Sequence, residues 1–325
     1  MLASVLGLVA ALVVVTVGAE FLVRGASVLA LRAGVSALFV GLTVVGIGTS
    51  TPELGASVFA SLQGSSGIAV GNVVGSNIFN ICVVLGLTAL IHPVRVELRA
   101  VRGELLVAIA VACAPLVALA TGGVLTRGIG LVLVAALVVY LALAFRAGRH
   151  GEPGQEQRAG EEVRSTLAIA PVPKFLDRVP VNVAFILAGL AFLLFGSRWF
   201  VDSAVEIASA RGLSERVVGL TIVSAGTSLP ELVTSIVAAR RRNPDIVLGN
   251  VIGSNVFNVL GVLGVSSLVR PQEVAAGMLA IDVPLMVLAT VCLLPVIRSG
   301  GRISRLEGGL FAAAYGVYLA WLLAR

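Results

Sequence analysis

The sequence predicts an all-α membrane protein with ten transmembrane helices, arranged as two inverted five-helix repeats. Of the 325 residues, 58% are hydrophobic and 12% are charged, about half the charged share of a soluble domain. Two segments recur: GLTVVGIGTSTPEL at 41–54 returns as GLTIVSAGTSLPEL at 219–232, and GNVVGSNIFN at 71–80 returns as GNVIGSNVFN at 249–258. Both copies follow after 178 residues, so one structural unit occurs twice.

Apolar runs bounded by charged residues or by Gly and Pro give ten predicted spans, each long enough for a hydrocarbon core of about 30 Å. The first five are 3–32, 37–62, 67–91, 103–120 and 124–145. The second five are 181–210, 213–240, 245–269, 277–297 and 304–324. We therefore expect a first repeat at 1–145, a polar linker with Pro and Gly at 146–178, and a second repeat at 179–325.

The distribution of positive charge predicts the orientation in the cell (inner) membrane. With the N-terminus outside, 17 of the 23 Lys and Arg residues fall in inner segments and 5 in outer ones. This bias predicts that both termini lie outside and that the linker is cytoplasmic. Because each repeat has an odd number of spans, the second repeat must enter the membrane from the opposite side, so the repeats are inverted. Topology also explains the pI near 10, and we expect a lipid bilayer rather than nucleic acid as the partner.

Each repeat carries a glutamate within an apolar span, Glu53 in one copy and Glu231 in the other. A carboxylate there is costly, and two at repeat-related positions indicate a functional site. Inversion brings the two glutamates toward each other near the bilayer midplane. The preceding prolines, Pro52 and Pro230, remove a backbone donor and free carbonyls just upstream. Carboxylates, hydroxyls and free carbonyls form an all-oxygen set that suits hard cations such as Ca²⁺ and Na⁺.

The second motif of each repeat combines glycine, serine and asparagine. The glycines are expected to let helices approach closely. The side chains expected to face a cation are Ser76, Asn80, Ser254 and Asn258. The amides expected to link helices or to support the ligands are Asn72, Asn77, Asn250 and Asn255.

The paired GTSxPE and GSNxFN motifs resemble the alpha repeats of the sodium/calcium exchangers of prokaryotic type, in the cation/calcium antiporter superfamily. The resemblance covers both repeats and leaves only the linker uncovered. It implies that Glu53 and Glu231 bind Ca²⁺ and Na⁺ alternately as transported ions, with no resident cofactor. The further ligands that it implies are Thr49, Ser50, Ser76, Asn80, Thr227, Ser228, Ser254 and Asn258. In part of the family the position of Asn258 is an aspartate, so this chain has two carboxylates where those members have three.

These features favour a secondary active antiporter that exchanges Na⁺ for Ca²⁺ by alternating access. An H⁺/Ca²⁺ antiporter stays open, because the same glutamates could cycle through protonation. A cation channel is a more distant alternative, because two convergent carboxylates bind too tightly for fast conduction. An intramembrane hydrolase is equally distant, because the sequence has neither HExxH nor GxSxG. The oligomeric state stays open.

The first and sixth spans lack the motifs, and we expect them to move during transport, with Gly34 and Gly212 as candidate hinges. Charged residues recur at intervals of four on both spans: Glu20 and Arg24 on the first, and Arg198, Asp202 and Glu206 on the sixth. This spacing predicts ion pairs within each helix.

Overall fold

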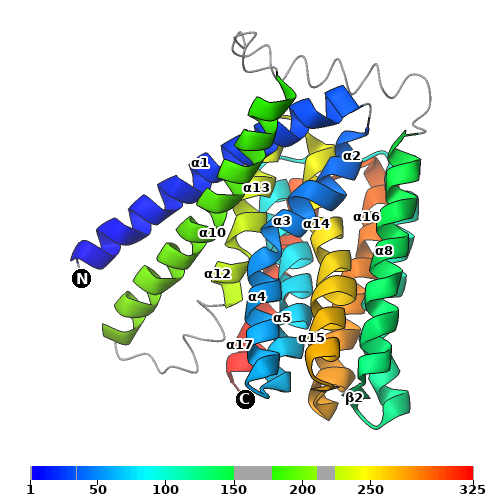
Figure 1. Ribbon diagram of the computed structural model, residues 1–325. Coiled ribbons are helices and arrows are strands. Elements are labelled where there is room, and N and C mark those ends of the chain that lie inside the picture. Colours follow the sequence, from blue (N-terminus) through cyan, green and yellow to red (C-terminus); the bar gives the residue numbers. More distant parts are fainter. Residues whose placement is uncertain (1, 34, 150–177, 211–223, 325) are drawn as a thin grey trace.

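The computed structural model describes residues 2–33, 35–149, 178–210 and 224–324. Figure 1 shows a bundle of helices with two long ones leaning across it. Seven helices of the described residues are long and apolar enough to cross a membrane, or eight if one bent pair counts as a single span. The two other predicted spans are also helical where they are described. The centre of the linker and the candidate hinges Gly34 and Gly212 lie outside the described residues.

The first repeat follows the five predicted spans. Its first span is α1 (Leu2–Ala33). The second is divided into α2 (Ala37–Val40), the π-helix η1 (Gly41–Val45), α3 (Gly46–Thr49) and α4 (Thr51–Leu62). The third contains α5 (Ser66–Phe79), the π-helix η2 (Asn80–Leu85) and α6 (Gly86–Ile91). The fourth is α7 (Leu98–Ala112) with the 3₁₀ helix η3 (Ala114–Thr121), and the fifth is α8 (Arg127–Arg149).

The second repeat has corresponding spans in the same order. Its first two spans are α10 (Val179–Ala210) and the pair α12 (Ser224–Thr227) and α13 (Leu229–Arg240). The next contains α14 (Pro244–Phe257), the π-helix η6 (Asn258–Leu263) and α15 (Gly264–Val269). The last two are the π-helix η7 (Met278–Asp282) with α16 (Val283–Gly300), and α17 (Arg305–Leu323). Both α14 and η6 have the bounds of α5 and η2 shifted by 178 residues.

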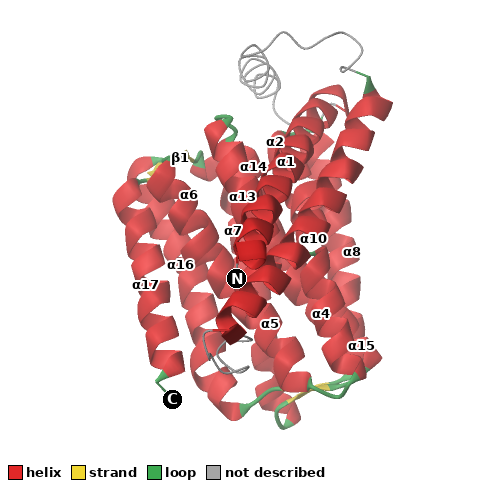
Figure 2. Cartoon of the chain, turned by 90° about the vertical axis from the view of Figure 1, so that its left-hand side faces the viewer, coloured by secondary structure: helices red, strands yellow, loops and turns green. Residues whose placement is uncertain are grey.

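Four short strands show that the repeats are inverted. β1 (Val94–Arg95) pairs antiparallel with β4 (Arg302–Ile303), and β2 (Val124–Leu125) pairs with β3 (Gln272–Glu273). β1 precedes the fourth span and β2 follows it, so the two pairs lie at opposite ends of the bundle (Figure 2). The offset of 178 residues relates β1 to β3 and β2 to β4. Each strand therefore has its repeat counterpart on the other face, which confirms the predicted inversion.

The two spans that carry the asparagine motifs form the centre of the bundle. An apolar 18-residue stretch of the span Pro244–Val269 is 94% buried and one of Ser66–Ile91 is 72% buried, whereas the corresponding stretches of five other spans are between 22% and 33% buried. Glycine makes the central contact possible: a Cβ added at Gly253 would lie 2.3 Å from the Leu42 carbonyl oxygen, and one at Gly249 would lie 2.7 Å from Gly41 Cα. The predicted packing role is confirmed for Gly249 and Gly253. It is not seen in the first repeat, where a Cβ added at Gly75 meets no atom within 4 Å and one at Gly71 meets only Met278 Cε at 3.7 Å. The outer helices present apolar side chains to the lipid instead.

The long helices α1 and α10 pack along each other and tilt across the rest of the bundle (Figure 1). Small residues line their contact: a Cβ added at Gly18 would lie 2.9 Å from the Gly189 carbonyl oxygen, and one at Gly196 would lie 2.7 Å from Val15 Cγ2. Gly18 and Gly196 are counterparts in the two repeats. A glycine at the corresponding position of each repeat therefore allows α1 and α10 to pack closely.

The ion pairs that we expected within α1 and α10 are not formed. Glu20 is bound by Arg241, at the C-terminal end of α13, whose Nε donates to Glu20 Oε2 at 2.8 Å. The Arg24 guanidinium lies over the Phe185 ring instead, 5.4 Å from its centre. α1 crosses α13 at this point, so a tertiary partner replaces the partner one turn away. In α10, Arg198, Asp202 and Glu206 are described and exposed, and no ion pair of 4.0 Å or less joins these three side chains.

Candidate cation site

The two glutamates lie just after breaks in their helices. The first break is at Ser50, between α3 and α4, and the helices on either side are bent by 44°. The second is at Ser228, between α12 and α13, with nearly the same backbone angles: φ −85° and ψ 10° at Ser50, φ −89° and ψ 9° at Ser228. A proline is accommodated at the start of the helix that follows, where no N–H is needed. Glu53 and Glu231 consequently lie in the first turn of a helix, where the dipole favours negative charge.

Each glutamate is held by a serine from the opposite repeat. Ser228 Oγ donates to Glu53 Oε1 at 3.0 Å, and Ser50 Oγ donates to Glu231 Oε1 at 2.9 Å. All four side chains are fully buried. The two GTSxPE motifs therefore face each other across the repeat boundary, as the inverted arrangement predicts.

The other hydroxyls extend this network into the central helices. Ser76 Oγ lies 3.3 Å from Ser228 Oγ, and Ser254 Oγ donates to the Gly46 carbonyl at 3.1 Å. Thr49 Oγ1 donates to Asn250 Oδ1 at 3.1 Å and lies 3.5 Å from Ser254 Oγ. Its counterpart Thr227 is half-buried at the end of α12. The structure thus brings the predicted hydroxyl residues to the helix breaks, together with one of the carbonyls expected just upstream of Pro52.

Two asparagines fix the backbone of the glutamates. Asn72 Nδ2 donates to the Glu53 carbonyl at 3.2 Å and to Ser57 Oγ at 2.9 Å. In the second repeat, Asn250 Nδ2 donates to the Glu231 carbonyl at 3.1 Å and to Ser235 Oγ at 2.9 Å. Ser57 and Ser235 were not singled out in the sequence, although the repeat offset relates them.

The other asparagines join the two central helices to each other. Asn77 Nδ2 donates to the Asn255 carbonyl at 3.1 Å, and Asn255 Nδ2 donates to the Asn77 carbonyl at 3.3 Å. The side-chain oxygens of the same two residues accept from Asn80 Nδ2 at 3.1 Å and from Asn258 Nδ2 at 3.0 Å. Asn77 and Asn255 therefore link the helices, as expected. They also hold the amide groups of Asn80 and Asn258 in place.

Four oxygens in this cluster have no hydrogen-bond partner among the residues that the structure describes. They are Glu53 Oε2, Glu231 Oε2, Asn80 Oδ1 and Asn258 Oδ1, all buried. Buried acceptors are nearly always paired, so each such atom calls for an explanation. These four form two repeat-related pairs, and carboxylate and amide oxygens are the ligands that Ca²⁺ takes. No three His, Cys, Asp or Glu side chains of the described residues come together, so the negative charge of the cluster comes from the two glutamates.

The π-helices at the centre of the bundle were not predicted. η2 begins at Asn80 and η6 begins at Asn258. A π-helical turn holds an additional residue, and such turns are frequent at functional sites. Both begin at a residue with an unpartnered oxygen. Hydropathy carries no signal for them, because the residues of η2 and η6 are apolar apart from these asparagines.

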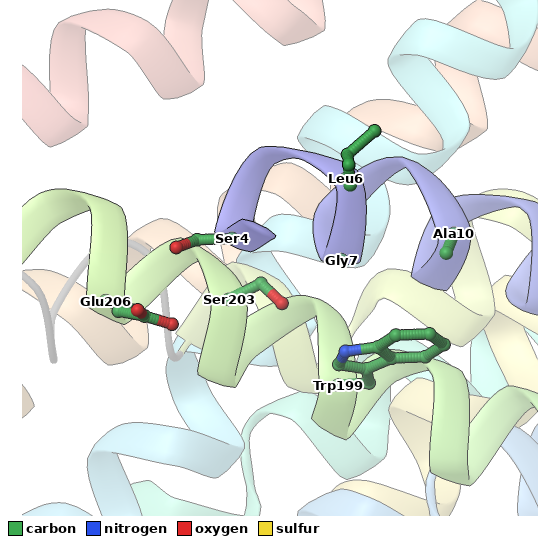
Figure 3. Close-up of a pocket in the computed structure, with 7 residues that line it drawn as sticks. All are labelled: Ser4, Leu6, Gly7, Ala10, Trp199, Ser203 and Glu206. Carbon is green, nitrogen blue, oxygen red and sulfur yellow. The ribbon is translucent and has the colours of Figure 1, made fainter. Parts of the chain in front are cut away.

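A separate cavity of about 480 Å³ lies between α1 and α10, away from the glutamates. Figure 3 shows the residues that line it: Ser4, Leu6, Gly7, Ala10, Trp199, Ser203 and Glu206. None of the ten predicted ion ligands is among them. Glu206, for which we expected an ion pair within α10, is exposed in this cavity.

Comparison with known proteins identifies the family. The model of the sodium/calcium exchanger protein family matches residues 3–146 and 181–324. The chain is 35% identical to the inner membrane protein YrbG of Escherichia coli (strain K12), with 97% of this chain and 95% of YrbG covered. It is 32% identical to the sodium/calcium exchanger MaX1 of Methanosarcina acetivorans, with 96% of each chain covered.

A solved structure agrees with these matches over the whole fold. The sodium-calcium exchanger NCX_Mj, soaked with zero Na⁺ and Ca²⁺, superposes with a TM-score of 0.81 at 32% identity and covers 98% of both chains. The prediction of a multi-pass membrane protein made of two repeats is confirmed. The chain belongs to the sodium/calcium exchanger protein family.

Proposed function

We propose that this protein is a secondary active antiporter that exchanges Na⁺ for Ca²⁺ by alternating access at the site between the two helix breaks. The observation that carries the proposal is the set of four buried, unpartnered oxygens on Glu53, Glu231, Asn80 and Asn258. Cations bound at this site would provide partners for these oxygens. The same proposal places the termini outside and the linker in the cytoplasm.

The charge of the site accounts for exchange rather than leak. Two carboxylates in a membrane are costly when empty, at about 2.5–3.5 kcal/mol per charge for insertion at the centre of a helix. One Ca²⁺ neutralises the pair, and so do two Na⁺. A site that reorients only when it is neutralised must carry ions in both directions.

The neutral oxygens set the choice of ion. The serine and threonine hydroxyls now donate to other oxygens, and each has lone pairs to offer when an ion binds. Carboxylates, amides and hydroxyls on separate helices tolerate the irregular coordination of six to eight oxygens that Ca²⁺ accepts. Mg²⁺ requires a tight octahedron and gives up water reluctantly. We therefore expect Ca²⁺ to be transported in preference to Mg²⁺.

Alternating access requires a group of helices that moves against the site, and α1 and α10 fit this role. None of the predicted ligands lies on them, and they pack mainly against each other. At the proposed cytoplasmic end, α1 is held to the C-terminal end of α13 by the Glu20–Arg241 pair. It is also held to the start of α14 by a hydrogen bond from Asn243 Nδ2 to Ser27 Oγ at 3.3 Å. These contacts would separate when the α1–α10 pair swings.

The H⁺/Ca²⁺ antiporter is the remaining alternative, because two protons also neutralise the glutamates. Membership of an exchanger family removes the intramembrane hydrolase. The proposal and this alternative differ in the ion that drives Ca²⁺ uptake.

Transport by reconstituted protein separates the two. Vesicles loaded with Na⁺ and diluted into Na⁺-free medium should take up radioactive Ca²⁺, whereas vesicles loaded with K⁺ should not. Uptake should persist when the pH is equal on both sides. Uptake that ignores Na⁺ and follows an imposed pH gradient would assign the protein to the proton-coupled class instead.

A further inference from the structure

A second cavity, of about 430 Å³, lies at the proposed cytoplasmic end of the bundle. One wall comes from the loop after α6 and the other from the turn between α13 and α14, so the cavity joins the first repeat to the second. The residues that line it are His92, Pro93, Val94, Arg95, Ala239, Arg242, Pro244 and Val247. None of them belongs to the candidate cation site.

The polar side of this cavity is cationic. His92, Arg95 and Arg242 are exposed, and none of the eight lining residues is acidic. Glu97 and Asp245 are close in sequence but do not line the cavity. An anion is therefore the ligand that the lining can recognise.

The neighbouring strand pair adds a third arginine. The register of β1 and β4 places Arg95 directly opposite Arg302, and like charges in that position are destabilising. The repeat relationship does not require two arginines to face each other here. The corresponding pair at the other end of the bundle is Glu273 opposite Val124. An anion near the two guanidinium groups would offset their repulsion.

The backbone of Arg242 supports the same conclusion. Its φ is +54°, the one positive value at a non-glycine position among the described residues. Its counterpart in the first repeat is Gly64, with a φ of +80°. The left-handed conformation disfavours any residue with a Cβ, so glycine would serve the turn better. The presence of arginine at this position is therefore explained by the positive charge that its side chain brings to the cavity.

The rest of the lining is apolar, with Val94, Ala239 and Val247 among its members. The cavity lies where α6 and α13 end, at the depth expected for lipid headgroups. Basic pockets between transmembrane helices on the cytoplasmic side bind anionic headgroups. We propose that this cavity binds the phosphate of an anionic phospholipid from the inner leaflet and so joins the two repeats.

Lipid retention by the purified protein tests this proposal without any ion gradient. Delipidated protein in detergent is mixed with phosphatidylglycerol or with phosphatidylcholine, and bound lipid is counted by native mass spectrometry. Phosphatidylglycerol should be retained in preference. Arg95→Gln and Arg242→Gln should each weaken retention about fivefold, the factor for one arginine near an anionic surface. Arg99→Gln, an exposed arginine on the same face that does not line the cavity, is the matched control and should leave retention unchanged.

Two further arms keep the result interpretable. Arg242→Gly introduces the residue found at the corresponding position of the first repeat, Gly64. Glycine adopts the positive φ of this turn without strain, so a loss of lipid in this variant cannot come from a strained turn. Inorganic phosphate at millimolar concentration should not displace the lipid. Equal retention by the arginine variants and the native protein would overturn the proposal, and so would displacement of the lipid by inorganic phosphate.

Discussion

At the scale of single residues, each carboxylate depends on both halves of the chain. Glu53 receives a hydrogen bond from Ser228, and Glu231 receives one from Ser50. Each glutamate also has its backbone carbonyl bound by an asparagine of its own repeat, Asn72 or Asn250. One carboxylate oxygen is thereby fixed and the other is left without a partner. Substitutions at these positions should act on ion binding more than on folding.

Removal of either negative charge should abolish exchange. In Glu53→Gln and Glu231→Gln, a single carboxylate remains to neutralise a divalent ion, so Na⁺-driven Ca²⁺ uptake should fall to the level of empty vesicles. Glu273→Gln, at an exposed position outside the bundle core, is the matched control. Asn80→Ala and Asn258→Ala remove neutral oxygens and should weaken exchange less. Normal uptake by either glutamine variant would refute the assignment.

Protons should compete with Ca²⁺ for the two glutamates. Protonation removes the negative charge that attracts the ion, so the apparent affinity for Ca²⁺ should fall as the pH falls, with Na⁺ held constant. The measurement is the initial rate of uptake against Ca²⁺ concentration at several pH values. An affinity that stays constant from neutral pH down to about pH 4, the ordinary range of a glutamate carboxylate, would count against a site built on this pair.

At the scale of elements, the central helix α14 approaches η1 of the second span backbone to backbone. Gly253 lies against the Leu42 carbonyl, with no room for a Cβ. Gly253→Ala should therefore destabilise the protein by about 1–3 kcal/mol, the usual cost of overpacking. Thermal unfolding in detergent measures the change. Gly103→Ala is the control, because a Cβ added at Gly103 meets no atom within 4 Å. Equal melting temperatures for the two variants would show that this contact is looser than the structure indicates.

The contact between α1 and α13 should favour the present arrangement of the helices. Arg241 and Glu20 are 30% and 41% exposed, so solvent screening limits the pair to at most about 1 kcal/mol. Glu20→Gln should then change the equilibrium constant between the two positions of the α1–α10 pair by up to about fivefold, in favour of the position not seen here. Distances between spin labels at Val13→Cys and Val317→Cys, both exposed to lipid, would report that shift.

A charge exchange provides the control for this contact. Glu20→Arg combined with Arg241→Glu should restore the native distances, because the pair is re-formed with its signs reversed. Arg198→Gln removes an exposed charge from α10 without breaking an ion pair and should change nothing. Unchanged distances in Glu20→Gln would show that the pair does not hold α1.

At the scale of the whole molecule, the inverted repeats are similar but not identical. The counterparts of Glu20 and Arg241 are Arg198 and Gln63, which cannot form an ion pair. If α10 takes the place against α4 that α1 now has against α13, that contact has no salt bridge. The two end states of transport should consequently differ in energy, even though the helices that form them are related by the repeat.

Labelling of single cysteines tests the orientation of the molecule. Glu273 and Glu97 are exposed and lie next to the strand pairs at opposite ends of the bundle. A thiol reagent that cannot cross membranes should label Glu273→Cys on intact cells and should reach Glu97→Cys only after the cells are opened. The unsubstituted protein gives the background from its own three cysteines. The reverse pattern would invert the proposed topology.

Much of the site could be predicted because the repeat offset identifies its members in pairs. The ten predicted ligand positions lie at or beside the two helix breaks and in the adjoining central helices. The supporting and linking roles predicted for four asparagines agree with the structure: Asn72, Asn250, Asn77 and Asn255. The cation-facing role of Asn80 and Asn258 stays a prediction. The ion pairs within α1 and α10 were wrong, because spacing along a helix does not show which other helix crosses it. That Asn80 and Asn258 leave their oxygens unpartnered depends on contacts across the repeat boundary.

The sequence by itself determined the membrane class, the two repeats, their inversion and the oxygen chemistry of the motifs. Hydropathy, internal repetition and an odd number of spans are properties of a linear chain and need no coordinates. The tertiary structure decided which oxygens lack partners, where the π-helices begin, that Glu20 meets Arg241, and that Arg95 and Arg242 share a cavity. These features join residues that are far apart in the sequence, 221 positions in the case of Glu20 and Arg241. Such contacts are fixed only when the helices pack.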